Sequence, residues 1–93
     1  MNIYDRALKD WGKNAQMLQV IEEMSELTKE ILKNVNRGKN NLNELIEETA
    51  DVEIMLEQLK YCLNINRQVE DYKEQKLLKI AAKLDEWESK NNV

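Results

Sequence analysis

Apolar residues recur at intervals of three and four along most of the chain. One such series lies between about Trp11 and Asn36, and its members are Met17, Val20, Ile21, Met24, Leu27, Ile31 and Val35. Three or four residues correspond to about one helical turn, so these side chains share one face of an α-helix. The pattern therefore predicts a long amphipathic helix over 11–36.

Two further helices follow from the same periodicity. The second is predicted from about Leu42 to Leu63, and a polar, β-branched stretch over 64–67 weakens the pattern after it. The third is predicted to end near Glu88. The apolar positions that define these two helices are Leu45, Val52, Met55, Leu56, Leu59 and Leu63, then Leu77, Leu78, Ile80, Ala81, Leu84 and Trp87. Residues 3–10 are expected to form a short leading helix.

A five-residue segment over 37–41 separates the first two long helices. Gly38 can adopt the left-handed conformation that ends a helix, and Asn41 or Asn43 can cap the next one. So short a connection predicts an antiparallel helical hairpin. We expect residues 1–93 to form a single domain made of this hairpin and a third helix.

The composition favours an all-α fold and narrows the possible chemistry. The 93 residues include two Gly and no Pro, which leaves few of the residues that turns require. There is no His, and the single Cys62 excludes an internal disulfide or a zinc knuckle. We expect Cys62 to be a small buried residue. Catalysis would therefore depend on carboxylates, amines and metal ions.

The charge balance and the length of the chain bear on its partners. A net charge of -4 argues against nucleic acid polymers and anionic membranes, which attract basic surfaces. No apolar run reaches the ~20 residues of a membrane span, and the first residues lack a secretory pattern, so we expect a cytoplasmic protein. A monomer of this size buries only about 60% of its unfolded surface. We therefore expect a homodimer or a dimer of dimers with a four-helix-bundle core.

Two acidic clusters stand out from the general abundance of Glu, one over 22–26 and one over 47–51. In each cluster two acids are three residues apart and so lie on the same side of the helix. These acids are Glu23, Glu26, Glu48 and Asp51. Folding of the hairpin brings the two pairs within about one turn of each other along the axis. Four carboxylates are thus predicted to converge.

Such a convergence favours a bound cation. Neighbouring carboxylates repel by roughly 1 kcal/mol per pair in water, and more where solvent is excluded. Oxygen ligands select a hard metal, so Mg²⁺ is the expected cofactor, with Mn²⁺ as a possible substitute. Mg²⁺ retains open positions that phosphate oxygens can occupy. A solvated acidic face without any metal is the simpler alternative, and the spacing by itself leaves both open.

The residues around the acids resemble a known family. Gln16 to Leu27, which contains Glu-Glu-x-x-Glu, and Glu47 to Leu59, which contains Glu-x-x-Asp, are similar to the MazG-like all-α nucleoside triphosphate pyrophosphohydrolases, most of all to short phage-type members. The related phosphoribosyl-ATP pyrophosphohydrolases fit less well, because the His that commonly follows their acidic motif has no counterpart here.

The resemblance implies a function and a set of site residues. It implies Mg²⁺-dependent hydrolysis of nucleoside or deoxynucleoside triphosphates to a monophosphate and pyrophosphate. The implied metal ligands are Glu23, Glu26, Glu48 and Asp51, and Glu22 and Glu23 are the implied catalytic residues, with Glu22 orienting a water or supporting the ligands. The chain carries no Ser-His or Cys-His arrangement, and the implied reaction needs none.

Residues that contact the nucleotide are harder to select from the sequence. Lys33, Lys60 and Lys76, with Lys79 beside it, are candidates for binding phosphate, although a lysine on an exposed helix usually serves solubility alone. Trp11 and Gln16 are candidates for contacting the base, although a Trp beside an apolar stripe is usually part of the core. The alternatives to an enzyme are a non-catalytic helical interaction protein and a nucleotide-binding sensor with the same fold.

Overall fold

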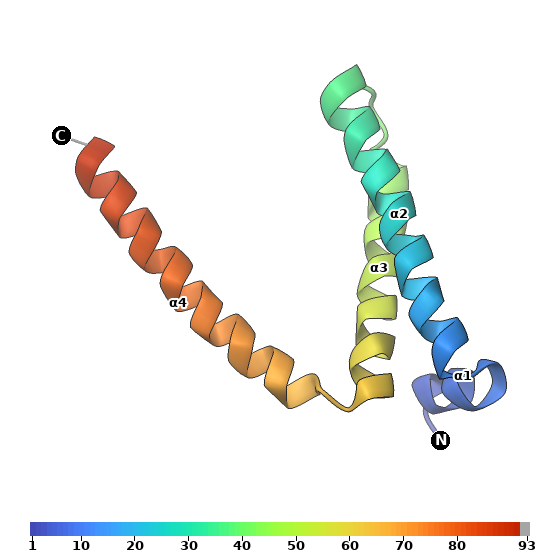
Figure 1. Ribbon diagram of the computed structural model, residues 1–93. Helices are drawn as coiled ribbons and strands as arrows, with labels where there is room; N and C mark the ends of the chain where they lie inside the picture. Colours follow the sequence, from blue (N-terminus) through green and yellow to red (C-terminus); the bar gives the residue numbers. More distant parts are fainter. Residues whose placement is uncertain (92–93) are drawn as a thin grey trace.

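The chain is helical throughout the part that the structure describes. The structure is a computed structural model that describes residues 1–91, and within them it contains four helices and no strand (Figure 1). The helices are α1 (Ile3–Trp11), α2 (Lys13–Arg37), α3 (Leu42–Leu63) and α4 (Asn66–Asn91). The all-α prediction is confirmed, and α3 begins and ends at the predicted residues.

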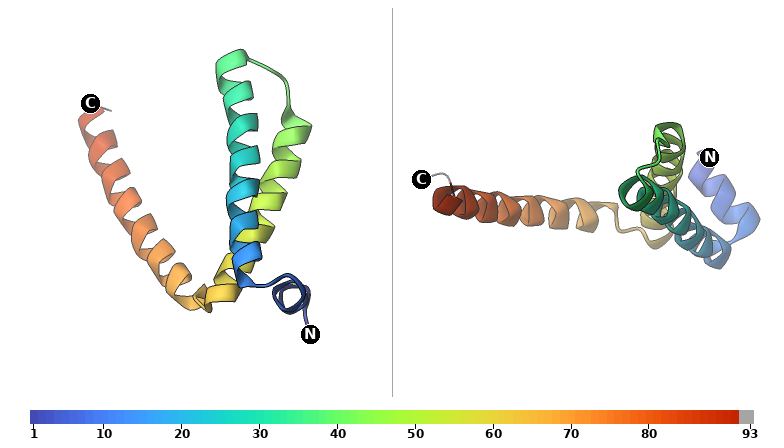
Figure 2. Two further views of the ribbon diagram at one scale, coloured as in Figure 1. Left: turned by 45° about the vertical axis from the view of Figure 1, so that its right-hand side comes forward. Right: turned by 90° about the horizontal axis from the view of Figure 1, so that it is seen from above.

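α2 and α3 form the antiparallel hairpin and lie side by side in all views (Figures 1 and 2). Gly38 ends α2 in the left-handed conformation, with φ 60° and ψ 25°, and its N–H donates to the Lys33 carbonyl. Val20 of α2 and Val52 of α3 are the buried apolar residues of this small core. Gln16 and Gln58 are buried as well, so the core of a single chain is thin and partly polar.

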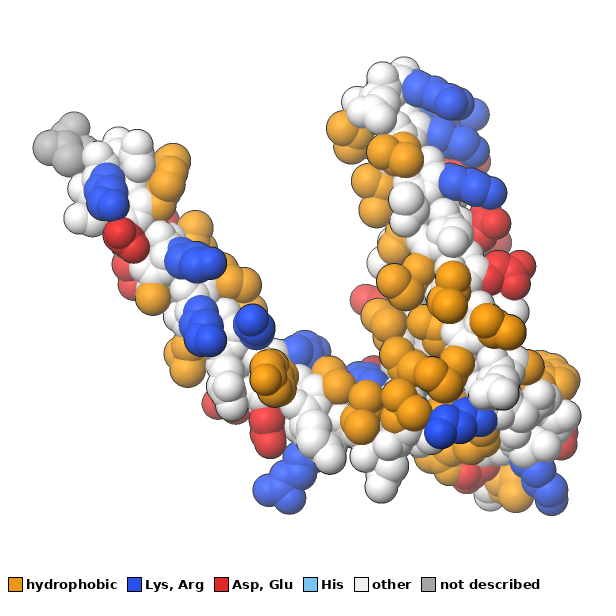
Figure 3. All heavy atoms as spheres, in the orientation of Figure 1, with side chains coloured by type: hydrophobic (Ala, Val, Ile, Leu, Met, Phe, Trp, Pro, Cys, Tyr) orange, Lys and Arg blue, Asp and Glu red, His pale blue; other side chains and the backbone are white. Residues whose placement is uncertain are grey.

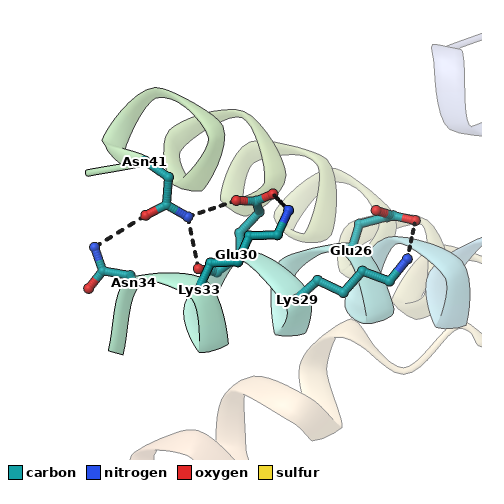
Figure 4. Close-up of polar contacts among 6 residues, drawn as sticks. All are labelled: Glu26, Lys29, Glu30, Lys33, Asn34 and Asn41. Carbon is teal, nitrogen blue, oxygen red and sulfur yellow. Dashed lines mark hydrogen bonds and ion pairs between the residues drawn. The ribbon is translucent and has the colours of Figure 1, made fainter. Parts of the chain in front are cut away.

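The loop of the hairpin is held by Asn41, but not in the predicted way. Asn41 precedes α3, yet its side chain makes no capping hydrogen bond. Instead its Nδ2 donates to the Glu30 carbonyl at 2.9 Å and to Glu30 Oε2 at 2.7 Å, and Asn34 Nδ2 donates to its Oδ1 at 3.3 Å (Figure 4). Asn41 is 2% exposed, so these bonds satisfy a buried amide. A tertiary contact across the loop has replaced a local cap.

The boundary between the first two helices differs from the prediction. Trp11 ends α1 instead of beginning the hairpin, because Gly12 adopts φ 89° and ψ 157° and breaks the helix there. Asn2 caps α1 by accepting a hydrogen bond from the Asp5 N–H at 2.8 Å. Gln58 of α3 ties α1 to the hairpin, since its Nε2 donates to the Tyr4 carbonyl at 3.1 Å.

α4 runs away from the hairpin after a tight corner (Figures 1 and 2). Asn64 ends α3 in the left-handed conformation with φ 55°, and the Ile65 N–H donates to the Lys60 carbonyl at 3.0 Å. None of the residues described in α4 is buried. The molecule is consequently extended, with principal dimensions of 58 × 36 × 18 Å. Within residues 1–91 there is no helix with the length and apolar character needed to cross a membrane.

Cys62 also differs from expectation. Its side chain is only half-buried, and its Sγ accepts a long contact of 3.7 Å from Gln58 Nε2. The cause is the open architecture, because a fourth helix that diverges from the hairpin leaves much of α3 uncovered.

Candidate functional site

Three carboxylates meet across the hairpin. Glu23 extends from α2, and Glu48 and Asp51 extend from α3. One oxygen of each lies within 4.8 Å of one oxygen of the other two, and all three side chains are half-buried. The antiparallel arrangement of α2 and α3 produces this meeting, since residues far apart in the sequence come level with each other along the axis.

Glu48 is the most perturbed member of the group. Its Oε2 is buried and has no hydrogen-bond partner among the described residues. Desolvation raises the pKa of Glu48 above the usual carboxyl value, and the negative charges of Asp51 and Glu23 raise this pKa further. The charged form of Glu48 is therefore disfavoured, because its oxygen is shielded from water and its neighbours are also acids.

Gln19 is a neighbour of the site that the motifs did not identify. Its Nε2 donates to Glu23 Oε1 at 2.8 Å, which fixes the orientation of that carboxylate. The signal was present in the sequence, because Gln19 and Glu23 are four residues apart and therefore adjacent on a helix surface.

The donor set suits a hard divalent cation. Oxygen atoms on opposite sides of one Mg²⁺ are separated by about 4.2 Å, twice the bond length of about 2.1 Å. The separation of up to 4.8 Å found here is close to that value. The unpartnered Oε2 of Glu48 is one atom that such an ion would satisfy. Exposed acidic groups are nevertheless common without an ion, so the geometry is compatible with a metal and does not require one.

The remaining acids of the motif lie at the edge of this group. Glu26 is not one of the three converging carboxylates, and its Oε1 lies 3.7 Å from Lys29 Nζ (Figure 4). Its charge still contributes to the raised pKa of Glu48. Glu22 is exposed. The hairpin thus brings three of the four predicted ligands together and leaves the fourth beside them in an ion pair.

Two of the candidate phosphate-binding lysines are engaged in ion pairs. Lys33 Nζ lies 3.1 Å from Glu30 Oε1, near the loop end of α2. Lys60 Nζ lies 2.6 Å from Glu57 and 3.9 Å from Glu70 of α4, and its side chain is 14% exposed. The hydrogen bond that Lys60 donates to Glu57 is the main cause of the raised pKa of Lys60. Lys60 supports the corner between α3 and α4, nine residues beyond Asp51.

The other candidates lie in different surroundings. Gln16 is 6% exposed and belongs to the core of the hairpin, whereas Trp11 is 70% exposed at the end of α1. Trp11 is therefore not the core residue that a position beside an apolar stripe suggests. Lys76 lies on α4, where it lines a shallow hollow with Ile65 and Tyr72. Gln16, Trp11 and Lys76 therefore do not belong to the group formed by the three carboxylates and Gln19.

Comparison of the chain with protein families, with curated proteins and with solved structures finds no match.

Proposed function

We propose that the chain is a Mg²⁺-dependent nucleotide pyrophosphohydrolase that converts nucleoside or deoxynucleoside triphosphates to a monophosphate and pyrophosphate. The observation that carries the proposal is the meeting of Glu23, Glu48 and Asp51 across the hairpin, with a buried and unpartnered oxygen on Glu48. The similarity of the surrounding residues to the MazG-like family supports the same conclusion.

In this proposal the acids of the site serve either as metal ligands or to orient water. Glu23, Glu48 and Asp51 hold the cation, and Gln19 keeps the Glu23 carboxylate in position. Glu26 completes the ligand set once it leaves Lys29, a change that costs little because exposed ion pairs are weak. Exposed Glu22 orients the attacking water. Mg²⁺, when bound, neutralises phosphate charge and makes water a better nucleophile.

The products provide the test of this function. We expect purified protein, Mg²⁺ and a panel of triphosphates to yield monophosphate and pyrophosphate, because attack at the α-phosphate breaks the bond between the α- and β-phosphates. Asp51→Asn should abolish the reaction, and Glu47→Gln, at an exposed position beside the site, is the matched control. Diphosphate and orthophosphate as first products would contradict the proposal. Saturable nucleotide binding without turnover would favour a sensor.

We also propose that the protein acts as a homodimer or a dimer of dimers, with a four-helix core to which two copies contribute. The support is the thin core of a single chain, in which Val20 and Val52 are the buried apolar residues, whereas Ile21, Met24 and Ile31 of α2 are 46% to 61% exposed. Apolar faces of this size are normally covered in a stable protein.

A further inference from the structure

α4 presents an apolar stripe that no other part of residues 1–91 covers. Leu77, Ile80, Leu84 and Trp87 are between 51% and 62% exposed. Their spacing of three, four and three residues places them on one face of the helix. Ten residues separate the first from the last, so the stripe is about 15 Å long.

A shallow apolar groove of similar length follows α2. One half is lined by Met17, Leu18 and Ile21, with Leu59 of α3 beside them, and the other half continues through Met24 to Thr28. Leu18 and Ile21 are 65% and 61% exposed. Met17 and Thr28, at the two ends of the groove, are eleven positions apart in α2, or about 16 Å. Figure 3 shows apolar side chains over this part of the hairpin and along the edge of α4 that is turned toward it.

The accessible surface is too large for a chain that stays alone. It amounts to 7697 Å², whereas a compact monomer of this mass exposes about 5,600 Å². The difference of about 2,100 Å² exceeds the about 800 Å² that each partner buries in a standard interface. The radius of gyration of 17.6 Å likewise exceeds the about 12 Å of a compact domain of this length.

The charges beside the two surfaces are complementary over most of their length. Between Gln75 and Leu84, α4 carries Lys76, Lys79 and Lys83 and no acid, and acids begin only at Asp85, before the last residue of the stripe. From Met17 to Thr28, α2 carries the acidic cluster over 22–26 and no basic residue. The stripe of α4 in the groove of α2 would therefore place lysines near acids.

The corner after α3 directs α4 away from the groove of its own chain. Only Asn64 and Ile65 connect α3 with α4, and the backbone hydrogen bond from Ile65 to Lys60 fixes their path. The ion pair between Lys60 and Glu70 braces the first turns of α4 against α3. The stripe and the groove of one chain are thus held apart (Figure 2).

We propose that α4 is an exchange arm that lies in the α2 groove of a second copy of this chain, while the arm of that copy lies in the groove of the first. A two-fold dimer makes the same contact twice, as an isologous interface requires. This inference rests on the self-association proposed above and is independent of the catalytic activity.

Two variants that affect opposite sides of the contact provide the test. We expect Leu84→Asp in the arm and Leu18→Asp in the groove each to weaken self-association at least about tenfold in sedimentation equilibrium. An equimolar mixture of the two should regain dimers, because one intact arm then meets one intact groove. Gln75→Asp introduces the same charge on the other side of α4 and should leave association unchanged.

Three results would overturn the inference. They are a wild type that is monomeric at micromolar concentration, normal association of Leu18→Asp, which would indicate contact between two arms, and a mixture of the two variants that stays monomeric. Leu84→Ser and Leu18→Ser replace the Asp variants if circular dichroism shows lost helix. A dimer that releases no pyrophosphate would remove the proposed activity alone, and an active monomer would remove the exchange arm and the proposed self-association but not the proposed activity.

Discussion

At the scale of single residues, Glu48 and Asn41 differ in whether their polar atoms have hydrogen-bond partners within the hairpin. Asn41 is buried and has hydrogen-bond partners for both ends of its amide. Glu48 has an oxygen that is buried, lies among other acids and has no hydrogen-bond partner within residues 1–91. A satisfied group of the first kind stabilises a fold, whereas an unsatisfied group of the second kind reduces stability until a ligand compensates it.

Glu48→Gln should separate stability from function. The raised pKa of Glu48 means that the folded protein binds this proton more tightly than the unfolded chain does. The stabilising contribution is therefore complete below the unfolded pKa and is lost as the pH rises through the folded pKa. In EDTA at neutral pH, we expect Glu48→Gln to be at least as stable as the wild type while lacking activity.

Urea unfolding across a pH series would check this. The advantage of Glu48→Gln over the wild type should grow from acidic to neutral pH, whereas Glu53→Gln, at an exposed position of the same helix, should give a nearly constant difference. A Glu48→Gln protein that is less stable than the wild type at neutral pH would contradict the repulsion argument.

Asn41→Ala should weaken the hairpin. It removes the two hydrogen bonds that this buried amide donates to half-buried Glu30, each worth about 0.5–1.5 kcal/mol. The bond from Asn41 is also the main cause of the lowered pKa of Glu30, and Lys33 adds to it. A lowered carboxyl pKa contributes stability above the unfolded pKa, and this contribution disappears as the pH falls through the folded pKa.

The difference in unfolding free energy between wild type and Asn41→Ala should accordingly be larger at neutral pH than in acid. Chemical denaturation at several pH values measures it. Asn43→Ala, at an exposed position two residues later, is the control and should change stability little. A difference that does not vary with pH would show that the stabilisation by Asn41 does not depend on the ionisation of Glu30.

At the scale of the elements, two glycines and one asparagine decide where the helices end. Gly12, Gly38 and Asn64 all have positive φ, and each ends a helix. The corners differ in their effect. The one at Gly38 folds α2 back onto α3, whereas the one at Asn64 sends α4 outward (Figure 1).

Gly12→Ala should be more destabilising than Gly38→Ala. A Cβ at either position meets nothing within 4 Å, so the difference depends on the backbone alone. Gly12 has φ 89° and ψ 157°, a conformation open essentially to Gly and costly to other residues by about 1–3 kcal/mol. Gly38 is in the left-handed helical region, which Ala adopts at about 1–2 kcal/mol. Denaturation midpoints of the two variants would compare them, and a reversed order would disprove this assignment.

At the scale of the whole molecule, cation binding should couple to stability. At about 100 times its dissociation constant, Mg²⁺ should raise the unfolding free energy of the wild type by about 2.7 kcal/mol, since it binds the folded state only. Thermal melts in Mg²⁺ and in EDTA measure the gain. Asp51→Asn should lose most of it, because Asp51 is one of the three converging carboxylates. An unchanged gain in Asp51→Asn would show that Mg²⁺ binds elsewhere.

The periodicity of apolar residues was sufficient to predict the helices, because helix formation depends on local spacing. It predicted α3 residue by residue and α2 to within two residues at each end. It predicted the boundary between the leading helix and α2 at residues 10–11 and not at Gly12, since a glycine at the edge of an amphipathic pattern does not reveal its φ. The sequence also predicted that the two acidic clusters lie beside each other, because a short loop fixes the axial register of a hairpin.

Other features depended on contacts between distant parts of the chain. Whether Glu26 joins Glu23, Glu48 and Asp51 or pairs with Lys29 is decided by side-chain packing between α2 and α3. The sequence predicts that Asn41 or Asn43 caps α3, whereas the Asn41 side chain makes no capping hydrogen bond and instead bonds to Glu30, eleven residues earlier, because burial favours the tertiary partner. The direction of α4 follows from the corner at Asn64 and the brace between Lys60 and Glu70. Sequence spacing determines which face of a helix is apolar, but only the tertiary structure determines whether that face meets its own chain or stays exposed.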